Sequence, residues 1–184
     1  LVLNHLDLYI GIYKQCRKKW LKMFKIKRNI LKKEKIKEIN KIVLDNYFPW
    51  YLQNKINYLD KTGYGYFTHS LYLDKKINSE FFKIIMPEII DNLNIKSLLR
   101  ARLNLYPKTS KVIKHAYHVD YKFKHMSAVY FINTNNGFLF FKNPSKKVKP
   151  EANKCVIFNG AHSHASSSCT DKSNRITLNI NYEL

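Results

Sequence analysis

The sequence predicts an α+β fold in which helices precede an antiparallel β sandwich or barrel. Two observations support this fold class. Before residue 96 the clearest apolar pattern has helical spacing, whereas from residue 97 onward the period changes to two, as in strands with one buried face. Helices followed by a run of short strands are typical of α+β domains, since parallel α/β sheets alternate the two element types.

The first expected element is a basic, mainly helical segment over residues 14–41. Trp20, Met23, Phe24 and Leu31 would form one apolar stripe, with lysines on the remaining face. We favour a helix that packs on the domain and exposes its lysines to solvent. Contact between this face and a nucleic acid or an anionic surface is the alternative, since a basic amphipathic segment is compatible with both.

The next helix is expected over residues 79–95. Its apolar residues recur at helical spacing: Phe82, Ile85, Met86, Ile89, Ile90 and Leu93. Pro87 lies in the middle of the pattern, where it removes a backbone hydrogen bond. We therefore expect a kink or two short helices.

The strands follow. Residues 97–106 alternate, so that Arg100, Arg102, Asn104 and Tyr106 share one face and apolar residues share the other. Arg100 and Arg102 either line a pocket, as substrate-binding groups, or meet solvent. Further strands are expected at residues 127–133, 137–142, 154–159 and 175–182. The stretch Asn135-Asn136-Gly137 predicts a turn between the first two of these.

Composition limits the class of protein. The 184 residues, 45% of them hydrophobic, suffice for a globular domain with its own core, while the formal net charge of +20 indicates affinity for polyanions without specifying the fold. Cys16, Cys155 and Cys169 are widely spaced and form no C-x-x-C pair, which favours free thiols and a cytoplasmic location. Since no apolar run approaches the roughly 20 residues of a membrane span, we expect none.

The segment HAYHVDYKF (residues 115–123) places His118 and Asp120 two residues apart. On a strand the two side chains would project side by side and could form two corners of a metal site. His162 and His164, some forty residues later, supply a third ligand. Two histidines and one carboxylate are the ligand set of non-haem iron(II) oxygenases, which leaves positions open for other ligands.

Arg175 follows His164 by eleven residues and opens the last expected strand, with Thr177 on the same face. A guanidinium there could hold the far carboxylate of a dicarboxylic acid through paired hydrogen bonds, assisted by the threonine hydroxyl. The combination of His-x-Asp, a distal His and Arg-x-Thr is more specific than any of its parts.

These motifs resemble those of the iron(II)- and 2-oxoglutarate-dependent oxygenases. The likeness is greatest to the small prolyl-4-hydroxylase-like oxygenases of phages, other viruses and marine microbes. It is carried by the stretches FPWYL, YFTHSLY, RLNLYPKTSKVIKHAYHVDY, AVYFINTNNGFLFF, NKCVIFNGAHSHASSSCTD and RITLNINYEL. It implies a double-stranded β-helix (jelly-roll, cupin-like) core from about residue 97 to 184. The oxygenase-like domain would span residues 42–184, behind a basic, mainly helical segment at 1–41 with N-terminal helices packed on the core.

The resemblance also implies roles for particular residues. His118, Asp120 and His164 would bind Fe(II) and form the catalytic centre, with His164 preferred over His162 because its spacing to Arg175 matches that of the family. Arg175 would pair with the C5 carboxylate of 2-oxoglutarate. The further candidates for the cosubstrate pocket are Asn104, Tyr106, Tyr130 and Thr177. Ser166 departs from the family, since many relatives have glycine at this position.

The implied reaction consumes O2 and 2-oxoglutarate, releases succinate and CO2, and hydroxylates a peptidyl (for example prolyl) or small-molecule substrate. One alternative is a dioxygenase that acts on nucleic acid, although such enzymes usually carry a second arginine where this chain has Asn181. Another is a non-catalytic nucleic-acid-binding protein on the same fold. A weak nucleic-acid contact would then involve the basic N-terminus. The expected location is the cytoplasm, or the host cytoplasm for a viral protein.

Overall fold

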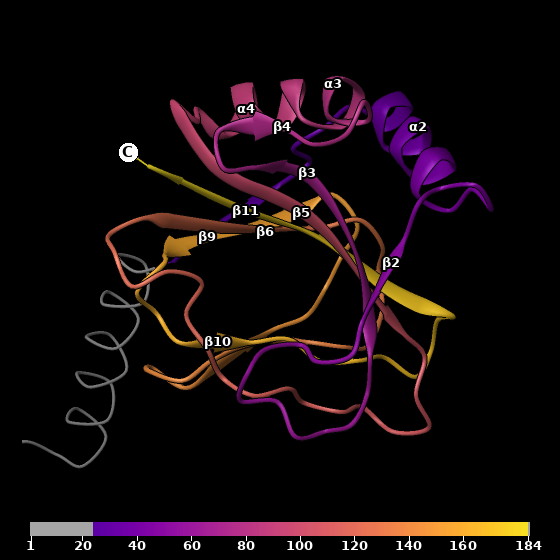
Figure 1. Cartoon of the computed structure of the whole chain (residues 1–184), viewed down its shortest axis with the longest axis vertical. Helices are drawn as coiled ribbons and strands as arrows, with labels where there is room; N and C mark the ends of the chain where they lie inside the picture. The colour runs from indigo at the N-terminus through magenta and orange to yellow at the C-terminus, as the bar shows by residue number, and fades with distance from the viewer. Residues whose placement is uncertain (1–23, 184) are drawn as a thin grey trace, which may run out of the picture.

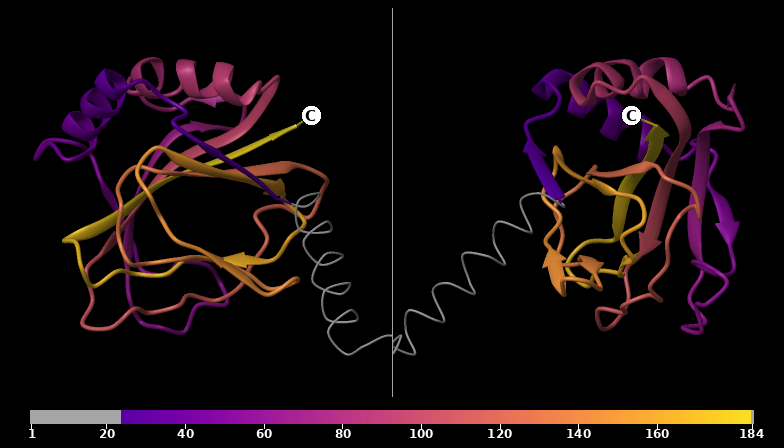
Figure 2. Two further views of the ribbon diagram at one scale, coloured as in Figure 1. Left: turned by 180° about the vertical axis from the view of Figure 1, so that it is seen from behind. Right: turned by 90° about the vertical axis from the view of Figure 1, so that its left-hand side faces the viewer.

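The computed structural model describes residues 24–183 as three layers: helices, a large antiparallel sheet and a small antiparallel sheet (Figures 1 and 2). The helices are α2 (Lys33–Val43), α3 (Phe82–Ile85) and α4 (Pro87–Leu93). They lie together on the outer face of the large sheet, and the small sheet lies opposite its inner face. The expected α+β class, with helices packed on a jelly-roll core, is confirmed.

The large sheet has the strand order β1-β9-β6-β11-β5-β3-β2, with β4 paired to β3. Its strands are β1 (Phe24–Arg28), β2 (Tyr51–Gln53), β3 (Tyr66–Leu73), β4 (Lys76–Ile77), β5 (Ser97–Pro107), β6 (Met126–Phe131), β9 (Lys154–Asn159) and β11 (Asn174–Glu183). The small sheet has the order β10-β7-β8, from β7 (Leu139–Phe141), β8 (Lys146–Val148) and β10 (His164–Ala165).

The central pair of strands follows the alternation of the sequence. On β5, Ala101 and Leu103 are buried against the helices, while on the neighbouring β11 Leu178 and Ile180 do the same. The polar residues between them therefore face the space between the two sheets. This arrangement explains why two strands from distant parts of the chain supply so many polar groups to one cavity.

Two apolar clusters hold the layers together. The larger one lies between the helices and the large sheet and includes Ile85, Met86 and Ile89, which are fully buried. The smaller one is rich in phenylalanine and joins the two sheets. Burial of a large apolar side chain contributes about 1.5–3 kcal/mol, so both interfaces are strongly stabilised.

The helical expectation for residues 79–95 is confirmed in its divided form, because α3 ends before Pro87 and α4 begins at it. Proline is well tolerated at the first position of a helix, where its missing N–H has no intrahelical partner.

The helix expected over residues 14–41 is wrong for residues 24–28. These residues form β1, which pairs antiparallel with β9, and α2 begins only at Lys33. Phe24 belongs to the cluster between the sheets, so its burial comes from strand pairing and not from a helical stripe. Trp20 and Met23 lie outside the described residues. The division of the chain near residue 41 stays a prediction, although β1 precedes it and belongs to the large sheet.

Two thiols are described, and both Cys155 and Cys169 are free and buried. Cys16 lies outside the described residues. None of the helices within residues 24–183 combines the length and the apolar character that crossing a membrane requires.

Candidate metal and dicarboxylate site

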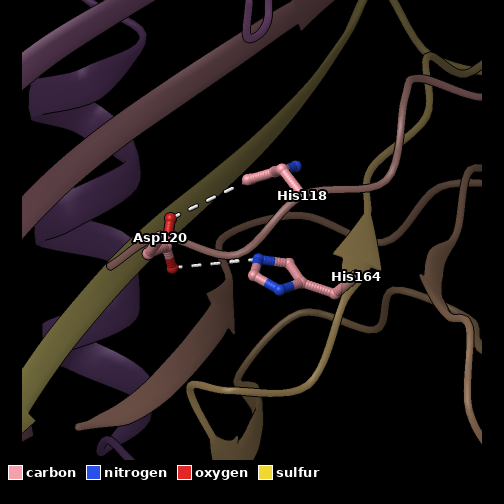
Figure 3. A group of neighbouring side chains, drawn as sticks. All are labelled: His118, Asp120 and His164. Carbon is pink, nitrogen blue, oxygen red and sulfur yellow. Dashed lines mark ion pairs between the residues drawn. The ribbon is translucent and has the colours of Figure 1, made fainter. Parts of the chain in front are cut away.

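Three potential metal ligands meet at one edge of the cavity between the sheets. Ligand atoms of His118, Asp120 and His164 all lie within 4.8 Å of one another. Nε2 of His118 is 3.9 Å from Oδ1 of Asp120, and Nε2 of His164 is 3.8 Å from Oδ2 (Figure 3). The figure shows both imidazoles directed toward the carboxylate, which is the arrangement that a shared cation requires.

The segment that carries His118 and Asp120 is not a regular strand, the geometry in which the two side chains would project side by side. It belongs to the connection between β5 and β6, and His118 forms an isolated antiparallel bridge with His164 of β10. The two residues exchange both backbone hydrogen bonds, each 2.9 Å long. This bridge fixes the two imidazoles relative to each other, so the pairing of distant segments replaces the expected strand geometry.

The surroundings of His164 favour the tautomer that suits metal binding. Its Nδ1 lies 3.1 Å from the carbonyl oxygen of His162, to which it can donate a hydrogen bond. Nε2 then keeps its lone pair toward Asp120, and such a backbone partner is usual for metal-binding histidines. Within the described residues, the ligand cluster contains His164 and not His162, which agrees with the preference for His164.

The electrostatics of the cluster favour an ionised carboxylate beside a neutral imidazole. Burial by itself would raise the pKa of Asp120, but the neighbouring His164 and Arg100 and a hydrogen bond from Asn181 hold that pKa well below its usual range. Burial lowers the pKa of His164 to about 4, against the opposing effect of Asp120. Both groups are therefore in the protonation states that bind a divalent cation near neutral pH.

A polar network supports Asp120 from behind. Nη2 of Arg100 donates to Oδ1 at 2.7 Å, and Nδ2 of Asn181 donates to Oδ2 at 2.9 Å. Arg100 also donates from Nε to Oδ1 of Asn181, and Ser127 donates to Oδ2 of the same aspartate at 3.4 Å. Strand alternation placed Arg100 on this face but could not reveal its role, because its partner comes from an irregular segment.

We expect Arg100→Gln to weaken metal binding by about 10- to 100-fold, the usual effect of removing a partner of a metal ligand. The glutamine loses the charge that keeps Asp120 ionised and one bond that orients it. Titration of the metal-free protein with iron(II) under anaerobic conditions measures the change. Arg28→Gln, a replacement at an exposed arginine of β1, is the matched control. Unaltered iron affinity in Arg100→Gln would show that Asn181 and Ser127 suffice to orient the carboxylate.

The cavity continues from the histidines toward Arg175 on β11. Besides His118 and His164, its wall includes Ile56, Tyr66, Arg102, Asn104, Tyr106, Val129, Leu139, Ser166, Arg175, Thr177 and Asn179. The predicted cosubstrate residues Asn104, Tyr106 and Thr177 thus share this cavity with Arg175. Tyr66, Ser166 and Asn179 also line it and were not predicted as site residues.

Arg175 is the most unusual group in this wall. It is only 1% exposed, yet its Nε and Nη1 have no hydrogen-bond partner within the described part of the chain. Its guanidinium lies over the ring of Tyr106, with Cζ 5.1 Å from the ring centroid. Burial lowers the pKa of this guanidinium, but an arginine side chain keeps its proton in proteins. A buried, charged and unpaired donor pair indicates a site for an anionic ligand.

The candidate role of Tyr130 in this cavity is wrong. Its ring is buried on the opposite face of β6, among the apolar residues under the helices, and its hydroxyl donates to Oδ1 of Asn153 at 3.1 Å. On β6 the residues toward the cavity side are Ser127, Val129 and Phe131. Tyr130 alternates with them, so its side chain lies on the other face of the sheet.

His115 stacks on Tyr106 beside the Arg175 end of the cavity, and we expect it to make the stability of the protein depend on pH. It is 4% exposed, its ring stacks on Tyr106, and burial lowers its pKa to about 4. In the unfolded chain a histidine titrates near pH 6.5. Between these values the unfolded state binds more protons, so the free energy of unfolding falls as the pH falls through this window, by about 3 kcal/mol in total.

Urea unfolding of the wild type and of His115→Asn, near neutral pH and near pH 5, tests this expectation. The variant should lose less stability between the two conditions than the wild type, because asparagine keeps a polar group for Ser166 but does not titrate. Equal losses in the two proteins would exclude His115 as the source of the pH dependence.

The comparisons with known proteins agree with this geometry. No protein-family model matches the chain, and no curated protein sequence is significantly similar to it. Solved structures are similar. A 2-oxoglutarate–iron(II) oxygenase from Burkholderia pseudomallei matches with a TM-score of 0.66 at 13% identity, over 87% of this chain and 85% of that chain.

Two further solved structures show the same likeness. A prolyl hydroxylase from Trichoplax adhaerens, in complex with a peptide fragment of the hypoxia-inducible factor oxygen degradation domain, gives a TM-score of 0.65 at 15% identity, over 87% and 83% of the two chains. A viral collagen prolyl hydroxylase from Paramecium bursaria Chlorella virus-1, in complex with 2-oxoglutarate, gives a TM-score of 0.59 at 11% identity, over 88% of this chain and 97% of that chain. At these identities the likeness establishes the fold, which is the double-stranded β-helix of this enzyme class.

Proposed function

We propose that this protein is an iron(II)- and 2-oxoglutarate-dependent oxygenase. The observation that carries the proposal is the placement of a metal-ligand cluster and a buried, unpaired arginine in one cavity. Neither feature alone would be sufficient, since buried charges also occur in structural networks. Together they match a metal centre beside a site for a dicarboxylate, on a fold that known oxygenases share.

His118, Asp120 and His164 fit iron(II) by the chemistry of their donors. Two imidazole nitrogens and one carboxylate oxygen bind one face of an octahedral iron(II) ion and leave three positions open. The carboxylate is ionised and His164 is neutral at physiological pH, so no proton has to be displaced from either of them. Arg100 and Asn181 hold the carboxylate in place.

Arg175 fits the distal carboxylate of 2-oxoglutarate. Its two unpaired nitrogens, Nε and Nη1, can donate charge-assisted hydrogen bonds to an anion, and such bonds are about twice as strong as neutral ones. Tyr106 stacks against the guanidinium, and Thr177 lies one step along the same strand face with its hydroxyl available to the same ligand. The apolar Val129 and Leu139 line the same cavity, where they would limit the access of water.

When bound, iron(II) and 2-oxoglutarate supply the activation of O2, in which one oxygen atom enters the substrate as a hydroxyl group and the other enters succinate as CO2 is released. The residues of this chain bind and orient these groups and keep bulk water away from them. Asp120 remains ionised throughout because its network of donors stabilises the charged form.

The substrate class that we propose is a peptidyl residue, for example proline, or a small molecule. The Trichoplax enzyme, whose structure contains a peptide fragment, supports the peptidyl form by analogy of fold. A nucleic-acid substrate is supported only by the net charge of +20. We place the reaction in the cytoplasm, since the two described thiols are free.

Formation of succinate from 2-oxoglutarate, measured with iron(II) and O2 present, tests the proposal. Many such enzymes turn over slowly without substrate, so a low basal rate is expected, and proline-containing peptides should raise it. His118→Ala should remove the basal rate, whereas the exposed replacement Lys76→Ala should not. Absence of succinate in the wild type under all conditions would reject the oxygenase assignment. Stimulation by single-stranded nucleic acid alone would instead reject the peptidyl or small-molecule substrate.

A further inference from the structure

A second pair of polar residues in the cavity wall has no role in the proposed binding of iron or of the distal carboxylate. Arg102 on β5 and Asn179 on β11 are direct cross-strand partners, and both line the cavity. Residues paired in this way have Cβ atoms about 4.5–5.5 Å apart, so their side chains can act on one ligand.

Asn179 is buried, and its Oδ1 atom has no hydrogen-bond partner among residues 24–183. The side chain is 8% exposed, and a buried polar atom without a partner costs about 1–3 kcal/mol. The oxygen and nitrogen of an amide are assigned from their partners, so this side chain can present either its oxygen or its NH2 group to the cavity. An unsatisfied amide in a binding cavity indicates that a ligand completes its hydrogen bonding.

Arg102 is charged but lacks an acidic partner among the described residues. Its Nε donates to Oδ1 of Asn104 at 3.0 Å, which fixes the guanidinium plane and leaves the two terminal NH2 groups for other acceptors. Arg100, its neighbour on the same strand face, differs because Asp120 neutralises it at 2.7 Å. Burial raises the pKa of the adjacent Tyr66, and Arg102 opposes that shift, which indicates that the charge of Arg102 acts inside the cavity.

The charge balance of the cavity also calls for a further anion. Its described wall contains Arg102 and Arg175 but no aspartate or glutamate. The carboxylate of Asp120 at its edge is already shared between Arg100 and the two histidines. After a divalent cation and a dicarboxylate have bound, Arg102 would still be without a counter-charge. Arg102 is partly buried in the cavity wall, and an anionic ligand group would offset the cost of holding its charge there without a counter-charge.

We propose that Arg102 and Asn179 form a second carboxylate subsite, which binds an acidic group of the molecule to be oxidised. This inference rests on the proposed function and specifies its substrate: a peptide or small molecule with a carboxylate close to the oxidised carbon. The guanidinium offers two parallel N–H donors to the carboxylate, and the Asn179 amide offers a third. Arg102 is thus a specificity-determining residue, which discriminates an acid from the corresponding neutral amide.

The same chemistry could serve the second carboxylate of 2-oxoglutarate, the one next to its keto group. The two sources are distinguished by saturating the protein with 2-oxoglutarate before any other anion is added. If the subsite belongs to the substrate, it stays free in that complex. If it belongs to the cosubstrate, it is already filled.

The experiment uses the full chain, labelled with 15N, with zinc in place of iron because zinc has no unpaired electrons to broaden the spectrum. The side-chain Nε–Hε signal of Arg102 is assigned by its loss in Arg102→Gln. Acetate is then titrated into the complex with 2-oxoglutarate, and acetamide, its neutral analogue, is titrated in parallel. We expect acetate to shift the Arg102 signal in a saturable manner and acetamide at equal concentration to leave it in place.

The variants give the specificity of the effect. In Arg102→Gln, acetate binding is followed at the signal of the Asn179 side-chain amide. The apparent Kd for acetate should rise by at least about tenfold, which is the effect expected for the loss of one charged hydrogen-bonding group. Arg102→Lys keeps the charge but loses the planar fork, and should give an intermediate value. Arg28→Gln on β1 should behave as the wild type. The 2-oxoglutarate affinity of Arg102→Gln should stay within about threefold of the wild-type value.

Two results would overturn the proposal. In the first, the Arg102 signal does not respond to acetate. In the second, the Arg102 signal shifts when 2-oxoglutarate binds and no longer responds to acetate, and the Arg102→Gln variant binds 2-oxoglutarate more weakly. The subsite would then belong to the cosubstrate. Failure of the proposed function itself has a different signature, since the wild type would then not bind 2-oxoglutarate at all, whatever acetate does at Arg102.

Discussion

Replacing Arg175 with glutamine is expected to raise the Kd for 2-oxoglutarate by about 30- to 1000-fold, which corresponds to about 2–4 kcal/mol. The wild-type guanidinium is buried and has two unpaired nitrogens, so the donors on Nε and Nη1 are free for the ligand. Glutamine offers no charge and only one NH2 group. Equilibrium titration of the iron(II) protein with 2-oxoglutarate, without O2, measures the effect.

The affinity for iron(II) serves as the internal control for this variant. Arg175 is absent from the ligand cluster within the described residues, so iron affinity should change by less than about threefold. Arg28→Gln controls for the loss of a positive charge elsewhere in a strongly basic chain. If Arg175→Gln bound 2-oxoglutarate as tightly as the wild type does, the dicarboxylate would have to bind elsewhere and the assignment of this cavity would be wrong.

Asp120→Asn is expected to reduce iron(II) affinity by more than about 100-fold, a larger effect than the 10- to 100-fold loss that follows removal of an outer-shell partner. The substitution keeps the shape of the side chain but removes its negative charge, and it leaves Arg100 without the carboxylate that lies 2.7 Å away. Calorimetric titration of the metal-free protein with iron(II), in the absence of O2, provides the measurement.

Asp91→Asn is a matched control for this substitution, since Asp91 is an exposed residue of α4. It should bind iron as the wild type does. The unfolding transition of Asp120→Asn must also be recorded, because a partly buried arginine that loses its charged partner destabilises the protein. A folded Asp120→Asn variant with wild-type iron affinity would contradict the proposed metal centre.

The two long strands show how much the sequence alone could predict. Their alternation correctly placed Asn104 and Tyr106 on one face of β5, and Arg175 with Thr177 on one face of β11. A strand buried on one side has a period of two, so the facing of each residue follows once the strand is recognised. The same rule, applied strictly to β6, would have excluded Tyr130 from the cavity, because it lies on the face of β6 whose apolar residues pack under the helices.

Contacts between distant segments could not be predicted in this way. Arg100 meets Asp120 because the connection after β5 folds back over the sheet, and that path is set by the bridge between His118 and His164. Similarly, Phe24 is buried by the pairing of β1 with β9, while the surrounding sequence also fits a basic amphipathic helix. Short segments with mixed patterns depend on tertiary pairing for their conformation, so propensity alone misassigns them.

The central claim is that one cavity binds iron(II) and 2-oxoglutarate together, and it is tested most directly by adding both to the metal-free protein without O2. We expect a weak visible absorption band when 2-oxoglutarate chelates the bound iron. This band should saturate at one equivalent of each component, and it should be absent at the same concentrations in Arg175→Gln. Iron binding without the band would indicate a metal site of another kind, and failure to bind iron would contradict the proposed oxygenase site as a whole.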